Sequence, residues 1–536
     1  MESSHQPCGY ADAYADTDYL KTCFVETDSH HSLPDISISF IAGRRGSGKS
    51  AATIVMLDWQ GAYDYKTRLA RSNLGETDQD FYTDFIHLLD SFREDVYKDV
   101  WEYVDERRVF CAIWKHLILV SAMLEVVPSS GVYIDFSNHG KVYRFLKSHD
   151  YYERSFWAMF ETVVHKIASA VAGQDPRADT IVKALNEVRD LLGSAEFRDA
   201  RKSLANILAA SNKTCLVIID ALIDRLFRDK PDLYLKCIEG LLDAVMDLLP
   251  HNYSPRLHIK CCIPGEALGN VRNYEIAKIR QRTCAIQWSP RDLFTVVGKR
   301  IAHFLVRSGK LSESSINDLD WRDPNEIGER VWQEVFPLEC ENQLGFVEPG
   351  FFYLCRHTHH YPREVISMVN HLLRHANDGT PRLTDATFGE VVHHACTSSV
   401  SEFTNRNRLI IPFLKQLLDG FCNASNILQF AEIASRIKES KDAWAKDGWS
   451  ERELLRSLVQ LGFLGVVKNY EDLRSRTFKA NFAYLTGEEV HYNRMSIFAI
   501  HPMFYDQLQI DPDRGRYVYP ATYSDSEEDP WETNHT

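Results

Sequence analysis

The stretch that decides the fold reads Ile36-Ser37-Ile38-Ser39-Phe40-Ile41-Ala42, followed directly by Gly43-Arg44-Arg45-Gly46-Ser47-Gly48-Lys49-Ser50. The first part is mostly apolar, which predicts a buried strand over residues 36–42. The second part matches G-x-x-x-x-G-K-[ST] at every fixed position. The apolar run AATIVMLDW that follows predicts a helix. The order strand, glycine-rich loop, helix is typical of a phosphate-binding loop in an α/β protein.

The residue types in this loop suit a bound phosphate group. Glycines let backbone N–H groups turn toward phosphate oxygens without a Cβ in the way, and the N-terminal end of the next helix attracts negative charge. We therefore predict a bound nucleotide, with the Lys49 ammonium on the β- and γ-phosphates and the Ser50 hydroxyl on Mg²⁺. The predicted nucleotide-binding residues of the loop are Gly43, Gly46, Ser47, Gly48, Lys49, Ser50 and Ala51.

A second apolar run, residues 215–220 (CLVIID), ends in an acid. A carboxylate at the end of such a strand binds Mg²⁺ in P-loop proteins, so Ser50 and Asp220 are the predicted metal ligands. Lys49, Asp220 and Asp224 are the predicted catalytic residues. Asp224 could hold the attacking water or a ligand in the second shell of the metal. The alternative is an Asp in the first turn of a helix, stabilised by the helix dipole. Ala221 stands where a water-activating Glu usually follows, which favours slow hydrolysis or a base from elsewhere.

The loop GRRGSGKS, the segment LVIIDALIDRL and the helical pattern of residues 290–510 resemble P-loop ATPases of the AAA+/STAND superfamily. Within that superfamily the chain is most similar to bacterial ATPases with a helical lid and a winged-helix tail, which are often found in defence or mobile-element operons. It is more distantly similar to origin-recognition ATPases. The resemblance spans residues 34–510. Members of this group commonly have D-x-x-D where this strand ends, whereas this sequence has D-x-x-x-D, from Asp220 to Asp224.

These patterns predict an α/β fold: a parallel P-loop NTPase sheet with helices on both faces, followed by a helical lid and a winged-helix domain. Further strands are predicted near residues 66–71, 257–263 and 284–288. The predicted parts of the chain are an acidic N-terminal extension (1–33), a P-loop ATPase core (34–289) with a large helical insertion (about 72–210), a helical lid (290–400), a winged-helix domain (401–510) and a disordered acidic tail (511–536).

The lid is predicted from two amphipathic helices, one starting at Pro290 and one at Pro362. In the ATPases that the chain resembles, an arginine at the start of a lid helix contacts the γ-phosphate, which gives that role to Arg363. The alternative is an exposed arginine beside an N-terminal proline. An arginine that reaches into a neighbouring subunit would make turnover depend on oligomerisation, and the candidates are Arg280, Arg282 and Arg300.

The winged helix is predicted from helices at residues 430–437 and 450–462 and from strands at 462–467, 482–485 and 496–500. Such modules often place a helix in the major groove of DNA. In STAND proteins a winged helix often packs on the ATPase instead. Residues 401–510 contain 14 basic and 13 acidic side chains, so their net charge gives only weak support for a DNA-binding surface. DNA binding and packing on the ATPase therefore both stay open.

Composition narrows the protein class. The 536 residues are 44% hydrophobic and have a net charge of -14, concentrated in the two ends, so a broad basic surface for a phosphate backbone is not indicated. The first 30 residues are polar, no long apolar stretch is free of charges, and the 12 cysteines form no CxxC pair. We therefore predict a cytoplasmic protein that does not span a membrane. The run Cys355 to His360 lacks an evident second ligand pair, so zinc is not predicted there.

The leading functional hypothesis is an ATP-binding, Mg²⁺-dependent ATPase that acts as a nucleotide-driven switch or motor in a multi-protein assembly. A setting in antiviral defence is implied only by the resemblance. The expected partners are further copies of the chain, an effector protein and, through the winged helix, DNA. The alternatives are a DNA-remodelling ATPase of the initiator or transposition-regulator type and a non-catalytic ATP-bound scaffold.

Overall fold

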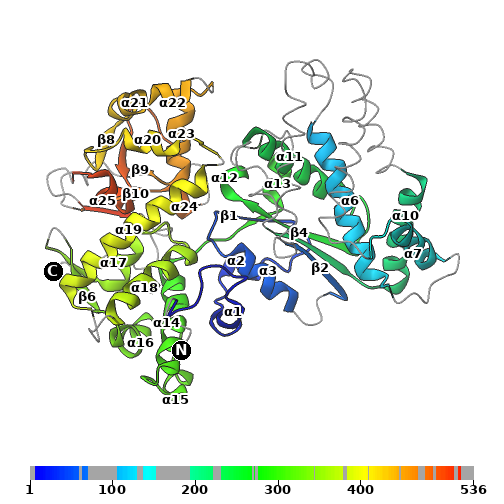
Figure 1. The fold of residues 1–536 in the computed structure, drawn as a ribbon, viewed down its shortest axis with the longest axis horizontal. Coiled ribbons are helices and arrows are strands. Elements are labelled where there is room, and N and C mark those ends of the chain that lie inside the picture. Colours follow the sequence, from blue (N-terminus) through cyan, green and yellow to red (C-terminus); the bar gives the residue numbers. More distant parts are fainter. Residues whose placement is uncertain are drawn as a thin grey trace. The chain divides into compact units, whose positions relative to one another are not determined.

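The computed structural model describes residues 6–58, 63–70, 106–129, 137–152, 194–220, 231–268, 271, 276–342, 345–377, 383–408, 410–445, 448–468, 477–486, 490–511 and 517–520. The chain forms two compact units (Figure 1). The sheet unit comprises Ser32–Ala42 and Ala52–Cys284, and the C-terminal unit comprises Met1–His31, Gly43–Ala51 and Ala285–Thr536. The glycine-rich loop therefore makes most of its contacts with the C-terminal unit, although it joins two elements of the sheet unit.

The sheet unit is built on a five-stranded parallel sheet with the order β2-β3-β4-β1-β5. Ala70 of β2 pairs with Asp220 of β3, and Ile219 of β3 pairs with Cys261 of β4. This register brings the carboxyl ends of the strands to one edge, which confirms the predicted α/β class with a parallel sheet. The strands are β1 (Phe40–Gly43), β2 (Tyr65–Ala70), β3 (Cys215–Asp220), β4 (Leu257–Pro264) and β5 (Thr283–Ala285).

Two predicted strands were too long. The prediction over residues 36–42 is wrong at its start, because residues 35–38 form a turn in which the Ser37 N–H donates to the Asp35 carboxylate at 2.7 Å. Ile36 is accordingly 46% exposed instead of buried. The prediction over residues 284–288 is wrong at its end, because β5 stops at Ala285. The Trp288 indole N–H instead donates to the Ser47 carbonyl at 2.7 Å.

Helices flank the sheet, and the apolar helix α6 forms much of the core. It packs on β2 and β3 and along α11 (Figure 1). Of the predicted helical insertion at about 72–210, the described residues contain α6, α7 and α10, and the rest lies outside them. The helices of this part of the chain are α3 (Lys49–Asp58), α6 (Glu106–Val126), α7 (Asn138–Ser148), α10 (Ala195–Ser211), α11 (Pro231–Asp247), α12 (Gly265–Leu268) and α13 (Ile276–Gln281).

The predicted lid region is helical, as its apolar periodicity indicated. Its first helix starts at Pro290, where the Ser289 side chain and Asp292 form a reciprocal capping box. The last helix runs past the predicted boundary at residue 400 and ends at Asn407. The elements are α14 (Pro290–Arg307), α15 (Glu313–Asn317), α16 (Pro324–Arg330), a 3-10 turn (Trp332–Glu334), a hairpin of β6 (Glu339–Glu341) and β7 (Val347–Pro349), α17 (Gly350–Arg356), α18 (Pro362–Asn377) and α19 (Asp385–Asn407).

The last part of the C-terminal unit contains a second five-stranded sheet, ordered β12-β10-β9-β11-β8. The predicted helices near 430–437 and 450–462 and the strands near 462–467 and 496–500 are confirmed with small shifts. The elements are α20 (Leu414–Asp419), β8 (Ile427–Gln429), α21 (Phe430–Glu439), α22 (Lys441–Trp444), α23 (Glu451–Leu461), β9 (Leu464–Val467), β10 (Thr477–Asn481), α24 (Ala483–Thr486), β11 (Ile497–Ile500), a 3-10 turn (Pro502–Phe504), α25 (Tyr505–Leu508) and β12 (Tyr517–Pro520).

Two predictions for this region are wrong. The predicted strand at 482–485 is the short helix α24, and the strand of the sheet is β10, which precedes it. Part of the tail for which we predicted disorder is ordered, because β12 pairs in parallel with β10 through Thr477 and Tyr517. The apolar residue Val518 of β12 is 1% exposed, so burial of its side chain adds to the backbone pairing.

The predicted acidic extension packs into the C-terminal unit instead of projecting from it. Its described part contains α1 (Thr17–Cys23) and α2 (Asp28–His31). Asp16 lies 2.6 Å from the Arg300 guanidinium in an ion pair that is almost completely buried. Arg300 also donates to the Cys8 carbonyl at 2.8 Å. These contacts give Arg300 a structural role within its own chain and disfavour it as an arginine that reaches into a neighbour.

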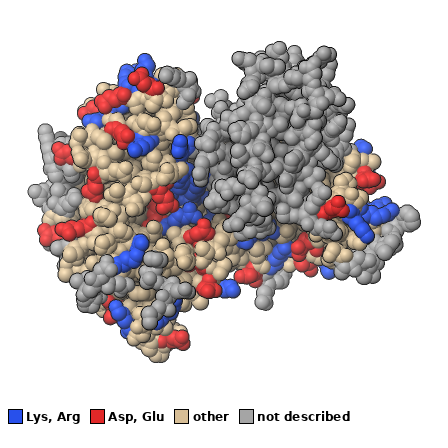
Figure 2. Space-filling model, viewed as in Figure 1, with Lys and Arg blue, Asp and Glu red and all other residues tan. Residues whose placement is uncertain are grey.

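On the face drawn in Figure 2, acidic and basic side chains are interspersed. Within the ranges that the structure describes, no helix has both the length and the apolar character needed to cross a bilayer.

Replacing Asp16 with Ala should destabilise the protein strongly. The Arg300 charge would then stay buried without its carboxylate, which costs about 3–5 kcal/mol. Asp18 is exposed in the first turn of α1, two residues after Asp16. Asp18→Ala is therefore the matched control and should change stability by less than about 0.5 kcal/mol. Urea unfolding measures both, and equal stabilities of the two variants would contradict this role of the pair.

Candidate nucleotide-binding site

The loop between β1 and α3 has a backbone shape that only glycine adopts readily at two positions. Gly46 and Gly48 have φ angles of +91° and +92°. At Gly46 an added Cβ would also lie 3.0 Å from the Cβ of Arg363, and at Gly48 it would lie 3.4 Å from the Trp288 ring. Two glycines of the motif therefore permit both the curled backbone and the close approach of neighbouring side chains.

The Lys49 side chain folds back over the loop. Its ammonium donates to the Gly43 carbonyl at 2.5 Å and to the Arg44 carbonyl at 3.0 Å. Ser47, beside it in the loop, is 1% exposed, and its hydroxyl oxygen has no hydrogen-bond partner among the described residues. A cation held over a glycine-rich curl that also contains an unpaired hydroxyl is a set of groups that fits a phosphate.

Asp220 is held against the helix that follows the loop. The Thr53 hydroxyl of α3 donates to the Asp220 carboxylate at 3.2 Å, and Asp220 is 1% exposed. Ser50 lies three residues before Thr53, one turn earlier on the same helix. The acid at the end of β3 and the helix with the predicted metal-binding hydroxyl are thus linked directly, and carboxylate and hydroxyl oxygens are ligands that suit Mg²⁺.

Arg363 lies next to the loop. Its backbone N–H, at the start of α18, donates to the Gly46 carbonyl at 3.3 Å, and its guanidinium donates to the Ala11 carbonyl at 3.3 Å. The predicted γ-phosphate contact and the loop are therefore neighbours within the C-terminal unit. Asp224, the third predicted catalytic residue, lies outside the described residues.

Two arginines in the variable positions of the motif connect the loop to distant segments, which sequence reasoning missed. The Arg44 guanidinium donates to the Leu461 carbonyl at 2.8 Å and to the Gln460 carbonyl, both in the last turn of α23. A cation there is favourable because the last carbonyls of a helix are negative. Arg45 donates to the Arg406 carbonyl at 3.2 Å, and Arg406 returns a hydrogen bond to the Arg45 carbonyl at 3.2 Å.

A buried polar cluster lies behind these contacts. The Glu364 carboxylate accepts from Arg406 at 3.0 Å and from the His359 backbone N–H at 2.7 Å. Burial alone would raise the pKa of Glu364, but His359 and Arg406 lower it by more, so the carboxyl is ionised. The His359 ring stacks on the His501 ring with centroids 4.7 Å apart. The loop is thus connected through Arg406, Glu364 and His359 to His501, the residue that follows β11.

Only part of this candidate site was predictable from the sequence. The motif predicted Lys49 and Ser50, and the acid at the end of β3 predicted Asp220. No pattern indicated Thr53, Glu364 or the partners of Arg44, because their contacts span 42 to 417 positions along the chain. The one sequence clue was the pair of arginines inside the motif, where any residue is allowed.

Comparison with known proteins adds no relative to this picture. The sequence matches no protein-family model and no curated protein.

His360 should make the stability of the protein depend on pH. It is buried at a φ of +53°, and burial together with the neighbouring His359 lowers its pKa to about 3. The folded state then binds a proton less readily than the unfolded state, so stability falls as the pH drops below about 6.5. From pH 7 to pH 5 this one group accounts for a loss of about 2 kcal/mol.

The test replaces His360 with Asn, which does not titrate and tolerates positive φ. Urea unfolding at pH 7 and pH 5 should show a smaller loss for His360→Asn than for the wild type. His491 is exposed, and His491→Asn should keep the wild-type difference. If the free energy of unfolding falls equally from pH 7 to pH 5 in all three proteins, the buried His360 does not cause the pH dependence.

Proposed function

We propose that this protein is an Mg²⁺-dependent ATPase that works as a nucleotide-driven switch, within the P-loop superfamily it resembles. The observation that supports this most directly is the hydrogen bond from Thr53 to Asp220, one helical turn after Ser50. This hydrogen bond joins Asp220, at the end of β3, to α3, the helix that follows the glycine-rich loop. That combination of residues is needed to bind a nucleoside triphosphate with its metal ion.

Each residue has a defined task in this proposal. Lys49 exchanges its two loop carbonyls for phosphate oxygens, which are stronger acceptors because they are charged. The Ser47 hydroxyl gains the partner it lacks among the described residues. Ser50 and Asp220 hold Mg²⁺, which neutralises phosphate charge when bound. Arg363 lies beside Gly46 and would interact with the terminal phosphate.

The contacts of the loop with the C-terminal unit support a switch over a simple hydrolase. Arg44 binds the end of α23, and Arg45 exchanges hydrogen bonds with Arg406. A ligand shifts a conformational equilibrium only when its affinity differs between the two states. A nucleotide that moves the loop backbone would change these contacts, and residues 408–520 would then respond to the bound nucleotide.

DNA remodelling is the second candidate, and it depends on treating residues 401–510 as a winged helix. The described helices and strands of this region are compatible with such a module. However, α23 has an acidic first turn with Glu451 and Glu453, and its last carbonyls bind Arg44. These features favour packing within the chain over insertion into a groove lined by phosphates. A cytoplasmic assembly with an effector protein and further copies of the chain remains part of the proposal.

Purified protein should bind ATP and hydrolyse it slowly with Mg²⁺. Lys49→Ala should reduce turnover at least a hundredfold, because it removes the cation that contacts the phosphates during transfer. Lys310→Ala, an exposed site after α14, is the control and should behave as the wild type. Duplex DNA should leave turnover unchanged. Stimulation by DNA that Lys49→Ala abolishes would favour the remodelling ATPase, and tight binding without turnover would favour the scaffold.

Arg44→Ala should accelerate basal turnover about tenfold while ATP still binds. The variant loses two charge-assisted hydrogen bonds to the end of α23. If these bonds stabilise the conformation in which α23 holds the loop by about 1.4 kcal/mol, their loss corresponds to a factor of ten. Arg452→Ala removes an exposed arginine from the same helix and serves as the matched control. Steady-state turnover and ATP affinity are measured for both. Unchanged turnover in Arg44→Ala would show that this contact does not restrain the loop.

A further inference from the structure

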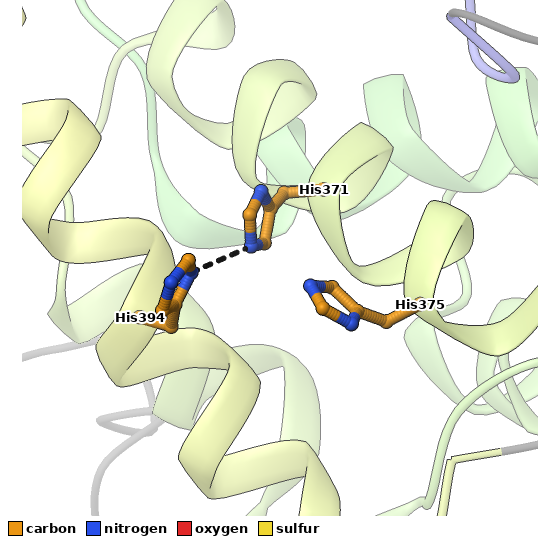
Figure 3. Close-up of side chains that lie close together, drawn as sticks. All are labelled: His371, His375 and His394. Atoms are coloured by element: carbon orange, nitrogen blue, oxygen red, sulfur yellow. Dashed lines mark hydrogen bonds between the residues drawn. The ribbon is translucent and has the colours of Figure 1, made fainter. Parts of the chain in front are cut away.

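Three histidines from two neighbouring helices of the C-terminal unit form a cluster that none of the preceding functions uses. His371 and His375 lie four residues apart on α18, and His394 faces them from α19 (Figure 3). One ring nitrogen from each residue lies within 4.8 Å of those of the other two. Residues i and i+4 share a helix face, so α18 presents both rings to the neighbouring helix.

The distances are close to those of a metal site. A tetrahedral ion with metal–nitrogen bonds of about 2.0–2.1 Å separates its nitrogen ligands by about 3.3 Å. His394 Nδ1 and His371 Nε2 are already 3.2 Å apart. The third ring, that of His375, has its centroid 4.9 Å from that of His371. The three nitrogens lie within 4.8 Å of one another, so side-chain rotations would have to close the remaining distance around an ion.

The cluster is accessible from solvent. His371 is half-buried while His375 and His394 are exposed, so an ion can reach the cluster from solvent.

We propose that His371, His375 and His394 bind a Zn²⁺ ion and that the fourth position is left to water. Neutral imidazoles are ligands that suit zinc. Three histidines with one open position are the composition of an accessible zinc site, whereas closed structural sites have four protein ligands. The ion would link α18 to α19, and Arg363, the second residue of α18, lies beside the glycine-rich loop.

The test compares full-length, untagged wild-type protein with His375→Ala and His394→Ala. After dialysis against chelator, the wild type should bind one more equivalent of Zn²⁺ than either variant, and Zn²⁺ should raise its thermal midpoint. Both substituted residues are exposed, so the metal-free variants should melt as the wild type does. His491→Ala, exposed elsewhere in the unit, is the matched control and should bind zinc normally.

Substitution of Co²⁺ identifies the ligands independently of stability. The wild type should give visible absorption typical of nitrogen and oxygen ligands, and His394→Ala should lose it. Equal zinc uptake by the wild type and both variants would overturn the proposal. A cobalt spectrum with thiolate charge-transfer bands would do the same, because it would assign binding to cysteines. Absence of zinc binding by the wild type would leave only a hydrogen bond between His371 and His394.

Discussion

The hydrogen bond between Thr53 and Asp220 is the contact on which the candidate site depends. It fixes a buried carboxylate at the end of β3 against the first turns of α3. A hydrogen bond to a charged group contributes about 1.5–3 kcal/mol. The parallel sheet makes the contact possible, since it brings the carboxyl ends of β3 and β1 to one edge, with β4 between them. The geometry of the acid and of the predicted metal-binding helix is therefore set by the fold itself.

The loop is the second constraint, because it belongs by its contacts to a different unit from the strand and helix it connects. Arg44, Arg45 and Gly46 each bind a residue more than 300 positions away. Such contacts connect the glycine-rich loop to the second half of the chain. This arrangement is consistent with the proposal that the C-terminal residues respond to a ligand in the loop.

Local features were predictable from the sequence, and contacts between distant segments were not. The loop, the strands β2 to β4 and the capped starts of α14 and α23 follow from short patterns of glycine, apolar and capping residues. The segment 482–485 was predicted as a strand because a short apolar run does not distinguish strand from helix. The strand β12 was missed since its pairing with β10 joins residues forty positions apart across an acidic, weakly patterned tail. The partners of Arg44 left no trace in the local sequence.

Hydrogen–deuterium exchange of the whole chain, with and without ATP and Mg²⁺, tests whether the C-terminal residues respond to a nucleotide in the loop. If they do, we expect slower exchange over residues 43–51 and a simultaneous change at the end of α23, around residues 459–465. Protection of the loop with no change at α23 would contradict the switch, and no protection of either segment would contradict nucleotide binding itself.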